Sequence, residues 1–380
     1  MKCQKELFNL NPDLTYLNCA YMSPQLKTVT ETGIRALLRK EDPTSIFPVD
    51  FFEPTEQLRS LFATMIEADD PKRIVTIPSV SYGMAIVSRN ISLNADDEIL
   101  VVGEQFPSNI YPWTRLAKEK GAKLLTVPSP PPMEGRGDKW NLDILDAIGP
   151  ATRIIAIPHV HWADGTFFDL LSISQKAKSF GALLIVDGTQ SVGALPFSVK
   201  KVQPDALICA GYKWLMGPYS LGLAYLGPAF DEGFPLEENW INRLNSEDFG
   251  GLVRYQEDYQ PGSLRYEVGE HSNFILVPML TQALRQIQEW GVENIQEYLL
   301  GIGKAPLQRL RDKGVWVEKE GAFSPHLFGI AMPDLAQAKE KLLQNKVHVS
   351  YRGHFVRVSP HVYNREEDLQ RLVDILLGGG

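Results

Sequence analysis

The chain has 380 residues, of which 44% are apolar and 22% are charged, and its formal net charge is −8. This size allows two packed domains, and the composition is that of an ordinary globular protein. The negative charge disfavours a surface for nucleic acid or anionic membranes, because both bind basic faces.

The sequence also argues against several other classes of protein. It begins with no signal-peptide core, and it contains no run of about 18 apolar residues, so we expect a cytoplasmic protein. The three cysteines, Cys3, Cys19 and Cys209, form no Cys-x-x-Cys pair, which disfavours a disulfide framework and a metal centre. The pair His159 and His161 is more typical of a structural role than of metal binding.

Short apolar runs recur between about residue 54 and residue 226, with helical patterns between several of them. The expected strands are RIVTI (73–77), EILVV (98–102), KLLTV (123–127), RIIAI (153–157), LLIVD (183–187), ALICA (206–210) and GLAYL (222–226). The expected helices cover residues 54–68, 108–121 and 169–181. This alternation predicts an open, mostly parallel sheet, and such sheets bind ligands outside the carboxyl ends of their strands.

The Pro/Gly-rich stretch 128–139 predicts a surface loop. From about residue 270 the pattern changes to long helices and shorter elements. The expected helices cover 273–291, 293–314, 334–346 and 366–377, and the expected strands lie in 315–320, 326–332, 347–353 and 354–360. Asn364 is the expected N-cap of the last helix.

This change of pattern predicts two structural units. We expect a large domain of residues 25–269, which contains the sheet. We expect a second, smaller unit that combines residues 1–24 with the α+β region of residues 270–380.

An acid and a lysine follow neighbouring expected strands. Asp187 ends the strand LLIVD, and Lys213 follows the strand ALICA. Both side chains are therefore expected at the ligand-binding edge. Burial lowers the pKa of a lysine and frees its amine to form a Schiff base. Enzymes that use pyridoxal 5′-phosphate (PLP) need such a lysine and an acid facing the pyridine nitrogen. Each residue alone also has an ordinary interpretation, with Asp187 as a capping residue at the end of a strand and Lys213 as a surface lysine.

The segment from DGTQSVG (187–193) to GYKWLMGPYSLGLAYLG (211–227) resembles the class V aminotransferase family, which includes kynureninase, cysteine desulfurases and isopenicillin-N-epimerase-like enzymes. The residues that match its pattern are Asp187, Gln190, Tyr212, Lys213, Trp214, Gly217, Pro218 and Gly222. The resemblance continues from YLNCAYMSP (16–24) to RVSPHVYNREEDLQRL (357–372). It implies the PLP-dependent transferase fold of the aspartate-aminotransferase type, with a mostly parallel seven-stranded sheet and a smaller α+β C-terminal domain.

The resemblance places the cofactor phosphate at IPSVSYGMAIVSRNI (77–91). Val80 and Ser81 would contact it through backbone amides and a hydroxyl. Ser81 can start the following helix, whose free N–H groups and dipole suit a dianion. Without the resemblance, Ser81 reads as an ordinary N-cap.

The resemblance also assigns residues around the cofactor ring. Phe106 would stack on the pyridine, and Asn109 belongs to the same FPSN segment, which is typical of kynureninase-like members. Trp162 lies in the segment that contacts the phenolic oxygen, where many relatives have Asn. We therefore expect Gln190 to supply more of that hydrogen bonding.

Further assignments concern the phenolic oxygen and the phosphate. Asp164 and His161 remain open as additional contacts to the phenolic oxygen. At the lysine motif, Ala210 stands where relatives often have a phosphate-binding serine, and the hydroxyl of Tyr212 is a candidate phosphate donor. Compared with those relatives, this chain lacks the phosphate contact of the serine, and the hydroxyl of Tyr212 can replace it.

SLRYEVGEHSNF (263–274) resembles the segment through which one subunit reaches the phosphate in its partner's site. We therefore expect a homodimer in which Ser272 or Asn273 makes that contact. Glu270 would repel a phosphate and is expected to point away from it. An ordinary loop before the long helix is the alternative interpretation.

HFVRVSP (354–360) resembles the segment that binds the substrate's α-carboxylate, and Arg357 is the arginine in it. The guanidinium fork suits a carboxylate. A lone strand arginine otherwise tends to be an exposed residue.

We therefore expect a PLP-dependent enzyme that acts on an amino acid through an external aldimine, with Lys213 and Asp187 as catalytic residues and a class V aminotransferase as the first choice. Alternatives on the same fold are a kynureninase-like hydrolase or lyase and an amino-acid epimerase. An alternative of another class is a non-catalytic protein that senses or stores PLP. We do not expect a cysteine desulfurase, because no cysteine follows Cys209 and only Cys19 lies in a segment that lines the cleft in relatives.

Overall fold

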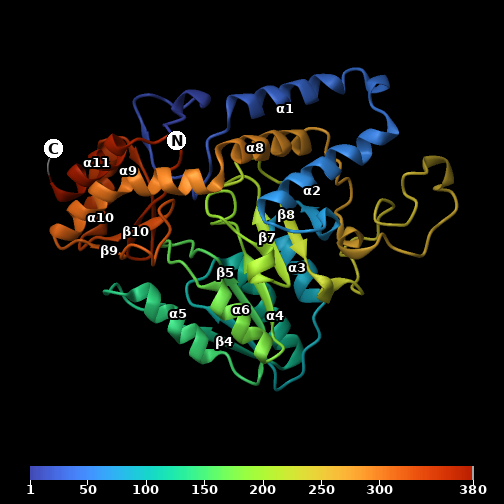
Figure 1. Ribbon diagram of the computed structural model, residues 1–380, viewed down its shortest axis with the longest axis horizontal. Helices are drawn as coiled ribbons and strands as arrows, with labels where there is room; N and C mark the ends of the chain where they lie inside the picture. The colour runs from blue at the N-terminus through green and yellow to red at the C-terminus, as the bar shows by residue number, and fades with distance from the viewer. Residues whose placement is uncertain (379–380) are drawn as a thin grey trace.

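The computed structural model describes residues 1–378 of the chain, and its largest element is a seven-stranded sheet (Figure 1). Neighbouring strands lie in the order β2-β8-β7-β6-β5-β3-β4, and β8 is antiparallel to both neighbours, whereas the other pairs are parallel. The prediction of a mostly parallel sheet is confirmed. Each strand coincides with one of the apolar runs: β2 (Ile74–Ile77), β3 (Glu98–Val102), β4 (Lys123–Val127), β5 (Thr152–Pro158), β6 (Leu183–Asp187), β7 (Ala206–Ala210) and β8 (Gly222–Leu226).

Both faces of the sheet are buried, because strand residues alternate between two apolar clusters. In β3, Leu100 and Val102 belong to one cluster, and Ile99 and Val101 belong to the other. This double burial explains why the strands read as continuous apolar runs. The helices that accompany the sheet are α3 (Val80–Arg89), α4 (Tyr111–Lys120), α5 (Arg136–Ala147), α6 (Leu170–Ser179) and α7 (Val199–Val202).

The strands β5, β6 and β7 are adjacent and parallel, so their carboxyl ends meet at one edge of the sheet. Pro158 pairs in register with Asp187, and Asp187 pairs with Ile208. The loops after these three strands therefore bring separate stretches of sequence together at that edge.

Long helices connect this sheet to the C-terminal region. Helix α8 (Leu276–Trp290) packs against α1 (Lys27–Arg39) and α2 (Glu53–Met65). Gly291, with a φ of 77°, ends α8, and α9 (Val292–Asp312) then leads to the C-terminal region (Figure 1).

A second, antiparallel sheet has the order β12-β13-β10-β9 and belongs to the C-terminal region. Separately, β1 pairs in parallel with β11, so the N-terminal segment lies beside this region (Figure 1). This pairing supports our proposal that residues 1–24 and 270–380 form one unit and residues 25–269 the other. The elements are β1 (Thr15–Tyr16), β9 (Trp316–Val317), β10 (Phe328–Ala331), α10 (Leu335–Gln344), β11 (Val347–His348), β12 (Ser350–Arg352), β13 (Phe355–Val358) and α11 (Glu366–Leu377).

Three local predictions are wrong. Helix α5 begins at Arg136, inside the expected loop 128–139, because the Arg136 side chain is fully buried and anchors the first turn. The N-cap of α3 is Ser79, whose hydroxyl accepts from the Tyr82 N–H, so Ser81 lies inside the first turn. The N-cap of α11 is Arg365, because Asn364 instead accepts a hydrogen bond from the His361 N–H.

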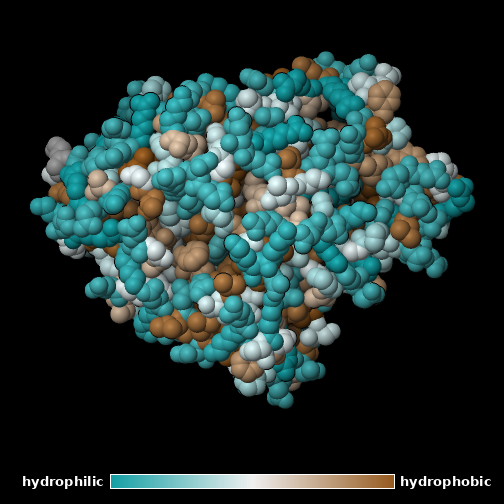
Figure 2. All heavy atoms as spheres, in the orientation of Figure 1, coloured by the Kyte–Doolittle hydropathy of each residue, from teal (hydrophilic) through white to brown (hydrophobic). Residues whose placement is uncertain are grey.

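Hydrophilic residues cover most of the face shown in Figure 2, and its apolar side chains are scattered. The irregular segment between β8 and α8 extends away from the body, at the right of Figure 1. Within residues 1–378, none of the helices combines the length and the apolarity that crossing a membrane requires.

Candidate active site

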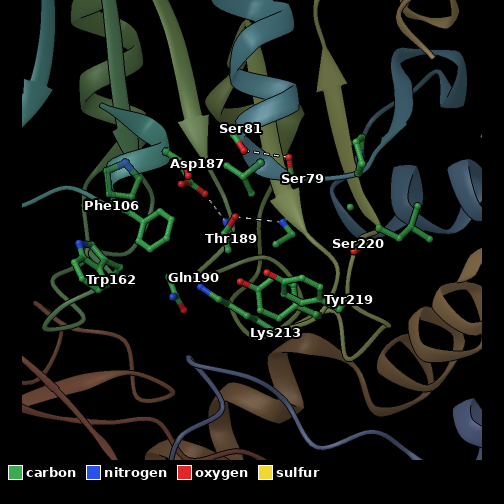
Figure 3. A pocket seen from close by; sticks show the side chains of 18 of the residues that line it. Ser79, Ser81, Phe106, Trp162, Asp187, Thr189, Gln190, Lys213, Tyr219 and Ser220 are labelled. Carbon is green, nitrogen blue, oxygen red and sulfur yellow. Dashed lines mark hydrogen bonds between the residues drawn. The ribbon is translucent and has the colours of Figure 1, made fainter. Parts of the chain in front are cut away.

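A cavity of about 310 Å³ lies at the carboxyl ends of the central parallel strands (Figure 3). Its walls combine strand ends, the start of α3 and the loop that follows β7. The lining residues include Ser79, Val80, Ser81, Phe106, Ser108, Trp162, Asp187, Thr189, Gln190, Ala210, Tyr212, Lys213, Tyr219, Ser220 and Gly222. Most of the predicted cofactor residues are therefore brought together in one space.

Lys213 lies in the turn after β7, and only 7% of the residue is exposed. Burial, followed by the nearby charge of Arg357, lowers the pKa of Lys213 to about 8. A substantial fraction of the amine is therefore neutral near physiological pH, which is the form that attacks a carbonyl.

Asp187 ends β6 and enters the same cavity from the side opposite Lys213 (Figure 3). Its Oδ1 atom accepts a 2.9 Å hydrogen bond from the Thr189 N–H, and the Thr189 hydroxyl accepts a 3.2 Å bond from the Ala210 N–H. Burial raises the pKa of Asp187, although the bonds from Thr189 and the charge of Lys213 oppose that shift. A cationic group in the cavity would favour the ionised carboxylate.

The side chain of Gln190 is held at both ends of its amide. Its Oε1 atom accepts a 2.9 Å hydrogen bond from the indole of Trp214, and its Nε2 atom donates a 3.2 Å bond to the Ala20 carbonyl. A glutamine amide has two N–H donors, so one remains for a ligand in the cavity.

The cavity wall formed by the start of α3 suits an anion. Val80 and Ser81 lie in the first turn, where backbone N–H groups have no partner within the helix. Tyr212 lines the same cavity, with its ring centroid 4.6 Å from that of Tyr219. Burial raises the pKa of Tyr212, which keeps its hydroxyl protonated and able to donate.

Phe106 and Trp162 line another wall of the cavity, with ring centroids 5.4 Å apart and an interplanar angle of 80°. The Trp162 indole donates a 2.6 Å hydrogen bond to the Glu104 carbonyl, and His161 Nε2 lies 3.2 Å from the same oxygen. Glu104 has a φ of 52°, which is costly for a residue with a Cβ. These contacts hold the loop that carries Phe106.

Asp164 and His161, the other candidates for the phenolic oxygen, are absent from the cavity lining. Asp164 forms a 2.9 Å ion pair with Arg136, and both side chains are almost completely buried. His161 Nδ1 lies 3.3 Å from Asp164 Oδ1. Asp164 and His161 thus contact each other and main-chain groups near Trp162.

Four further predicted residues, Asn109, Ser272, Asn273 and Arg357, also lie outside the lining of this cavity. Asn109 is fully buried, and its side-chain oxygen accepts a 2.9 Å bond from the indole of Trp113. Asn273 accepts bonds from backbone N–H groups at the start of α8, and Ser272 is buried beside it. Contacts of Ser272 or Asn273 with a partner's phosphate stay a prediction.

Arg357 lies in β13 and is 1% exposed. Its Nη1 atom donates a 2.9 Å bond to the Trp162 carbonyl, and its Nη2 atom donates a 3.2 Å bond to the Ser350 hydroxyl. Within residues 1–378 it forms no ion pair, whereas the equally buried Arg59 and Arg136 each pair with a carboxylate. Burial, and then the charge of Arg352, lowers the pKa of Arg357 to about 9.

Several cavity residues are absent from the sequence-based set. Thr189, which anchors Asp187, stands two positions after it in the DGTQ motif, so the motif itself was the available signal. Tyr219 and Ser220 line the cavity from the loop before β8. Ser220 has a φ of 67°, and no sequence pattern marks a serine for that conformation.

Two of the three thiols are buried, which affects their protonation. Burial raises the pKa of the Cys19 thiol to about 12, and it also raises the pKa of Cys209. Throughout the described part of the chain, no three or more His, Cys, Asp and Glu side chains gather in a metal-binding group.

Known proteins resemble this chain along most of its length. It is 25% identical to an uncharacterized aminotransferase, YcbU, of Bacillus subtilis, with 85% of this chain and 83% of that protein covered. It is 27% identical to isopenicillin N epimerase of Streptomyces clavuligerus, with 97% and 95% covered. It is also 27% identical to a probable cysteine desulfurase of Pyrococcus abyssi, with 84% and 82% covered.

Among solved structures, the cysteine desulfurase from Thermococcus onnurineus has a TM-score of 0.83 at 21% identity, covering 100% of this chain and 99% of that one. This likeness shows the fold. The model of the family Aminotransferase class-V matches residues 44–372. The chain therefore belongs to the class V aminotransferase family and is a PLP-dependent enzyme.

Proposed function

We propose that PLP occupies the cavity around Lys213, with Lys213 as the Schiff-base lysine and Asp187 facing the pyridine nitrogen. The observation that carries this proposal is a buried lysine with a lowered pKa facing a buried carboxylate across one cavity (Figure 3). A Schiff base needs the neutral amine, and a protonated ring nitrogen supplies the cation that Asp187 lacks.

The other cavity walls support the same assignment. The free N–H groups of Val80 and Ser81 and the hydroxyl of Tyr212 would hold the phosphate. Phe106 would pack against the ring, and the remaining amide donor of Gln190 would reach the phenolic oxygen. The cavity thus offers an aromatic side chain for the ring, hydrogen-bond donors for the phosphate and an acid for the pyridine nitrogen.

We further propose the roles of the residues in the reaction with an amino acid. When bound, PLP serves as an electron sink for charge that develops at the substrate Cα. Arg357 would bind the α-carboxylate, and that carboxylate would supply the ion-pair partner that this buried guanidinium lacks within residues 1–378. Lys213 would move a proton at the substrate Cα, and its lowered pKa suits both removal and return of that proton.

Transamination is the reaction that we propose first, supported by the family and by the resemblance to YcbU. The alignment with isopenicillin N epimerase over nearly the whole length of both chains favours epimerisation as the second candidate. A kynureninase-like hydrolase or lyase and a non-catalytic PLP-binding protein are further alternatives. Residues that move a proton at Cα serve each of the catalytic choices.

The first experiment tests the cofactor lysine. Purified protein is reduced with borohydride, and the modified peptide is identified by mass spectrometry. We expect PLP on Lys213, loss of the label in Lys213→Ala, and normal labelling in the exposed control Lys118→Ala. Label on another lysine would contradict the proposal.

A second experiment separates the reactions. Amino acids are supplied with a keto-acid acceptor in D₂O, and products are followed by mass spectrometry. Amino transfer supports an aminotransferase, whereas deuterium at Cα with racemisation and no transfer supports an epimerase. Cleavage of kynurenine would indicate the hydrolase. Spectral changes without any product would indicate a non-catalytic protein.

We also propose a homodimer in which Ser272 or Asn273 contacts the partner's phosphate, because neither residue lines the cavity of its own chain. Light scattering measures the assembly state. A monomer with full activity at the assay concentration would contradict shared sites.

A further inference from the structure

Two arginines share one face of the small antiparallel sheet. In its register, Ser350 of β12 lies opposite Arg357 of β13, and Arg352 lies opposite Phe355. Ser350 and Arg352 are two residues apart and therefore point to the same side. The hydrogen bond from Arg357 to the Ser350 hydroxyl confirms that Arg357 points to that side as well. Arg352 is thus the diagonal neighbour of Arg357.

Both guanidinium groups converge on Trp162, which lines the active-site cavity. Arg357 donates from Nη1 to the Trp162 carbonyl at 2.9 Å. The Cζ atom of Arg352 lies 5.3 Å from the centroid of the Trp162 ring. Arg357 therefore contacts the main chain of Trp162, and Arg352 contacts its indole ring.

The two positive charges have no carboxylate partner within residues 1–378. Arg352 donates from Nη1 to the Tyr351 carbonyl at 2.7 Å, and its buried Nε has no hydrogen-bond acceptor among the described residues. Arg59 and Arg136, which are buried as deeply as Arg357, are both paired with acids, whereas Arg352 is only partly buried. Packing on Trp162 gives Arg352 a cation–π contact, but this contact does not neutralise the guanidinium charge.

The same region contains a third cation, Lys213. Arg357 and Arg352 both lower the pKa of Lys213, so the two guanidinium charges act on the atom that performs the chemistry. One α-carboxylate balances one arginine. Because Arg352 is only partly buried, water solvates part of its charge, and a second anionic group on the substrate would supply the ion pair that Arg352 lacks within residues 1–378.

We propose that Arg352 is a specificity-determining residue that binds an oxyanion on the substrate's side chain, while Arg357 binds the α-carboxylate. The substrate class is then an amino acid whose side chain ends in a carboxylate, a sulfinate or a phosphate. This inference rests on the proposed function of Lys213 and Arg357.

The experiment measures substrate binding directly. Holoenzyme is titrated with isosteric pairs, aspartate against asparagine and glutamate against glutamine, and the change in the visible spectrum of the bound cofactor gives the Kd. Cysteine sulfinate and phosphoserine then identify which oxyanion fits. The variants are Arg352→Gln, Arg352→Lys, and Arg371→Gln as a control on an exposed arginine of α11.

We expect the acid of at least one pair to bind on the order of tenfold more tightly than its amide, and Arg352→Gln to remove that difference. Binding of the amide should change little. Arg352→Lys should retain part of the preference, because it keeps a point charge without the fork. Arg371→Gln should behave as the parent protein does.

Two results would overturn the inference. Acid and amide binding equally in the parent protein would show that no second anion is recognised, and this comparison needs no variant to fold. Equal weakening of acids and amides by Arg352→Gln would show that both arginines hold one α-carboxylate. If PLP is bound to Lys213 and no amino acid changes the spectrum, the proposed amino-acid substrate fails together with this inference.

Discussion

The Nη1 atom of Arg357 lies 2.9 Å from the carbonyl oxygen of Trp162 and donates a hydrogen bond to it. Trp162 in turn donates from its indole to the Glu104 carbonyl, in the loop that carries Phe106. The arginine of the small sheet is thereby linked to an aromatic wall of the cavity. The Arg357 side chain therefore has two structural hydrogen bonds, to the Trp162 carbonyl and the Ser350 hydroxyl, and remains a cation without an acid in the described chain.

Arg357→Ala should raise the KM for amino acids strongly and leave PLP bound. Removing one partner of a buried carboxylate contact costs about 2–5 kcal/mol. Steady-state kinetics and the cofactor's visible absorption measure the two quantities separately. Arg371→Ala serves as the exposed control. An unchanged KM would mean that Arg357 is structural or that the substrate has no α-carboxylate.

Asp187→Asn should leave PLP bound and reduce turnover sharply. The ring nitrogen would lose the anion that keeps it protonated, so the electron sink becomes weaker. Thr189 still anchors the side chain at this position, because an asparagine oxygen can accept the same N–H bond. Turnover close to that of the parent protein would refute the role of Asp187.

The capture of PLP by the cofactor-free protein should depend on the pKa of Lys213. Burial and Arg357 lower that pKa to about 8, so the rate of capture should rise with pH, with a midpoint near 8, and level off at higher pH. Arg357→Ala removes a repelling cation and should move the midpoint to higher pH. Asp187→Asn removes an attracting anion and should move it to lower pH. Identical midpoints in all three proteins would contradict this electrostatic account.

Much of the site follows from the sequence because parallel strands share an edge. The apolar runs that end at Asp187 and Ala210 predict both the sheet and the meeting of Asp187 with Lys213. The contribution of Arg352 was not predictable in this way. Its relation to Trp162 depends on how the small sheet docks against the cavity, a contact between segments far apart in the chain.

Local competition between hydrogen bonds explains the errors in helix ends. Ser79 and Ser81 are both suitable caps for α3, and only the three-dimensional path of the loop selects Ser79. Asn109 lies in the FPSN segment with Phe106, yet its side chain binds Trp113 in the core instead of lining the cavity.

The buried pair of Arg136 and Asp164 should stabilise the fold behind Trp162. Burial disfavours the ionised form of Asp164, but the charges of His161 and Arg136 hold the pKa of that carboxyl well below its usual range. The stabilisation is therefore present at neutral pH and is lost as the pH falls below the ordinary range of an aspartate.

Asp164→Ala should lower the free energy of unfolding by about 3–5 kcal/mol, because it leaves Arg136 buried without its acid. Denaturant unfolding at pH 7 measures the change. Asp143→Ala, which breaks the exposed pair with Lys139, is the matched control and should cost less than about 0.5 kcal/mol. Equal losses in the two variants would show that the buried pair contributes little.

The last prediction concerns sulfur chemistry, because relatives of this chain include probable cysteine desulfurases. Such a reaction needs a thiolate that attacks the substrate sulfur and carries it as a persulfide. Cys209 lies inside β7 and is 1% exposed, and Cys19 is fully buried. Burial raises the pKa of both thiols, so neither is a thiolate near neutral pH.

We therefore expect no catalytic release of sulfide from cysteine. The purified holoenzyme is incubated with cysteine, sulfide is measured over many turnovers, and mass spectrometry is used to look for a persulfide on each of the three cysteines. Cys19→Ser is the decisive variant, because the residue after Cys19, Ala20, accepts a hydrogen bond from Gln190, which lines the cavity. Its activity toward the true substrate should match that of the parent protein. Sulfide release that disappears in Cys19→Ser but persists in Cys3→Ser would show that the buried thiol becomes accessible during turnover and would assign the desulfurase reaction to this chain.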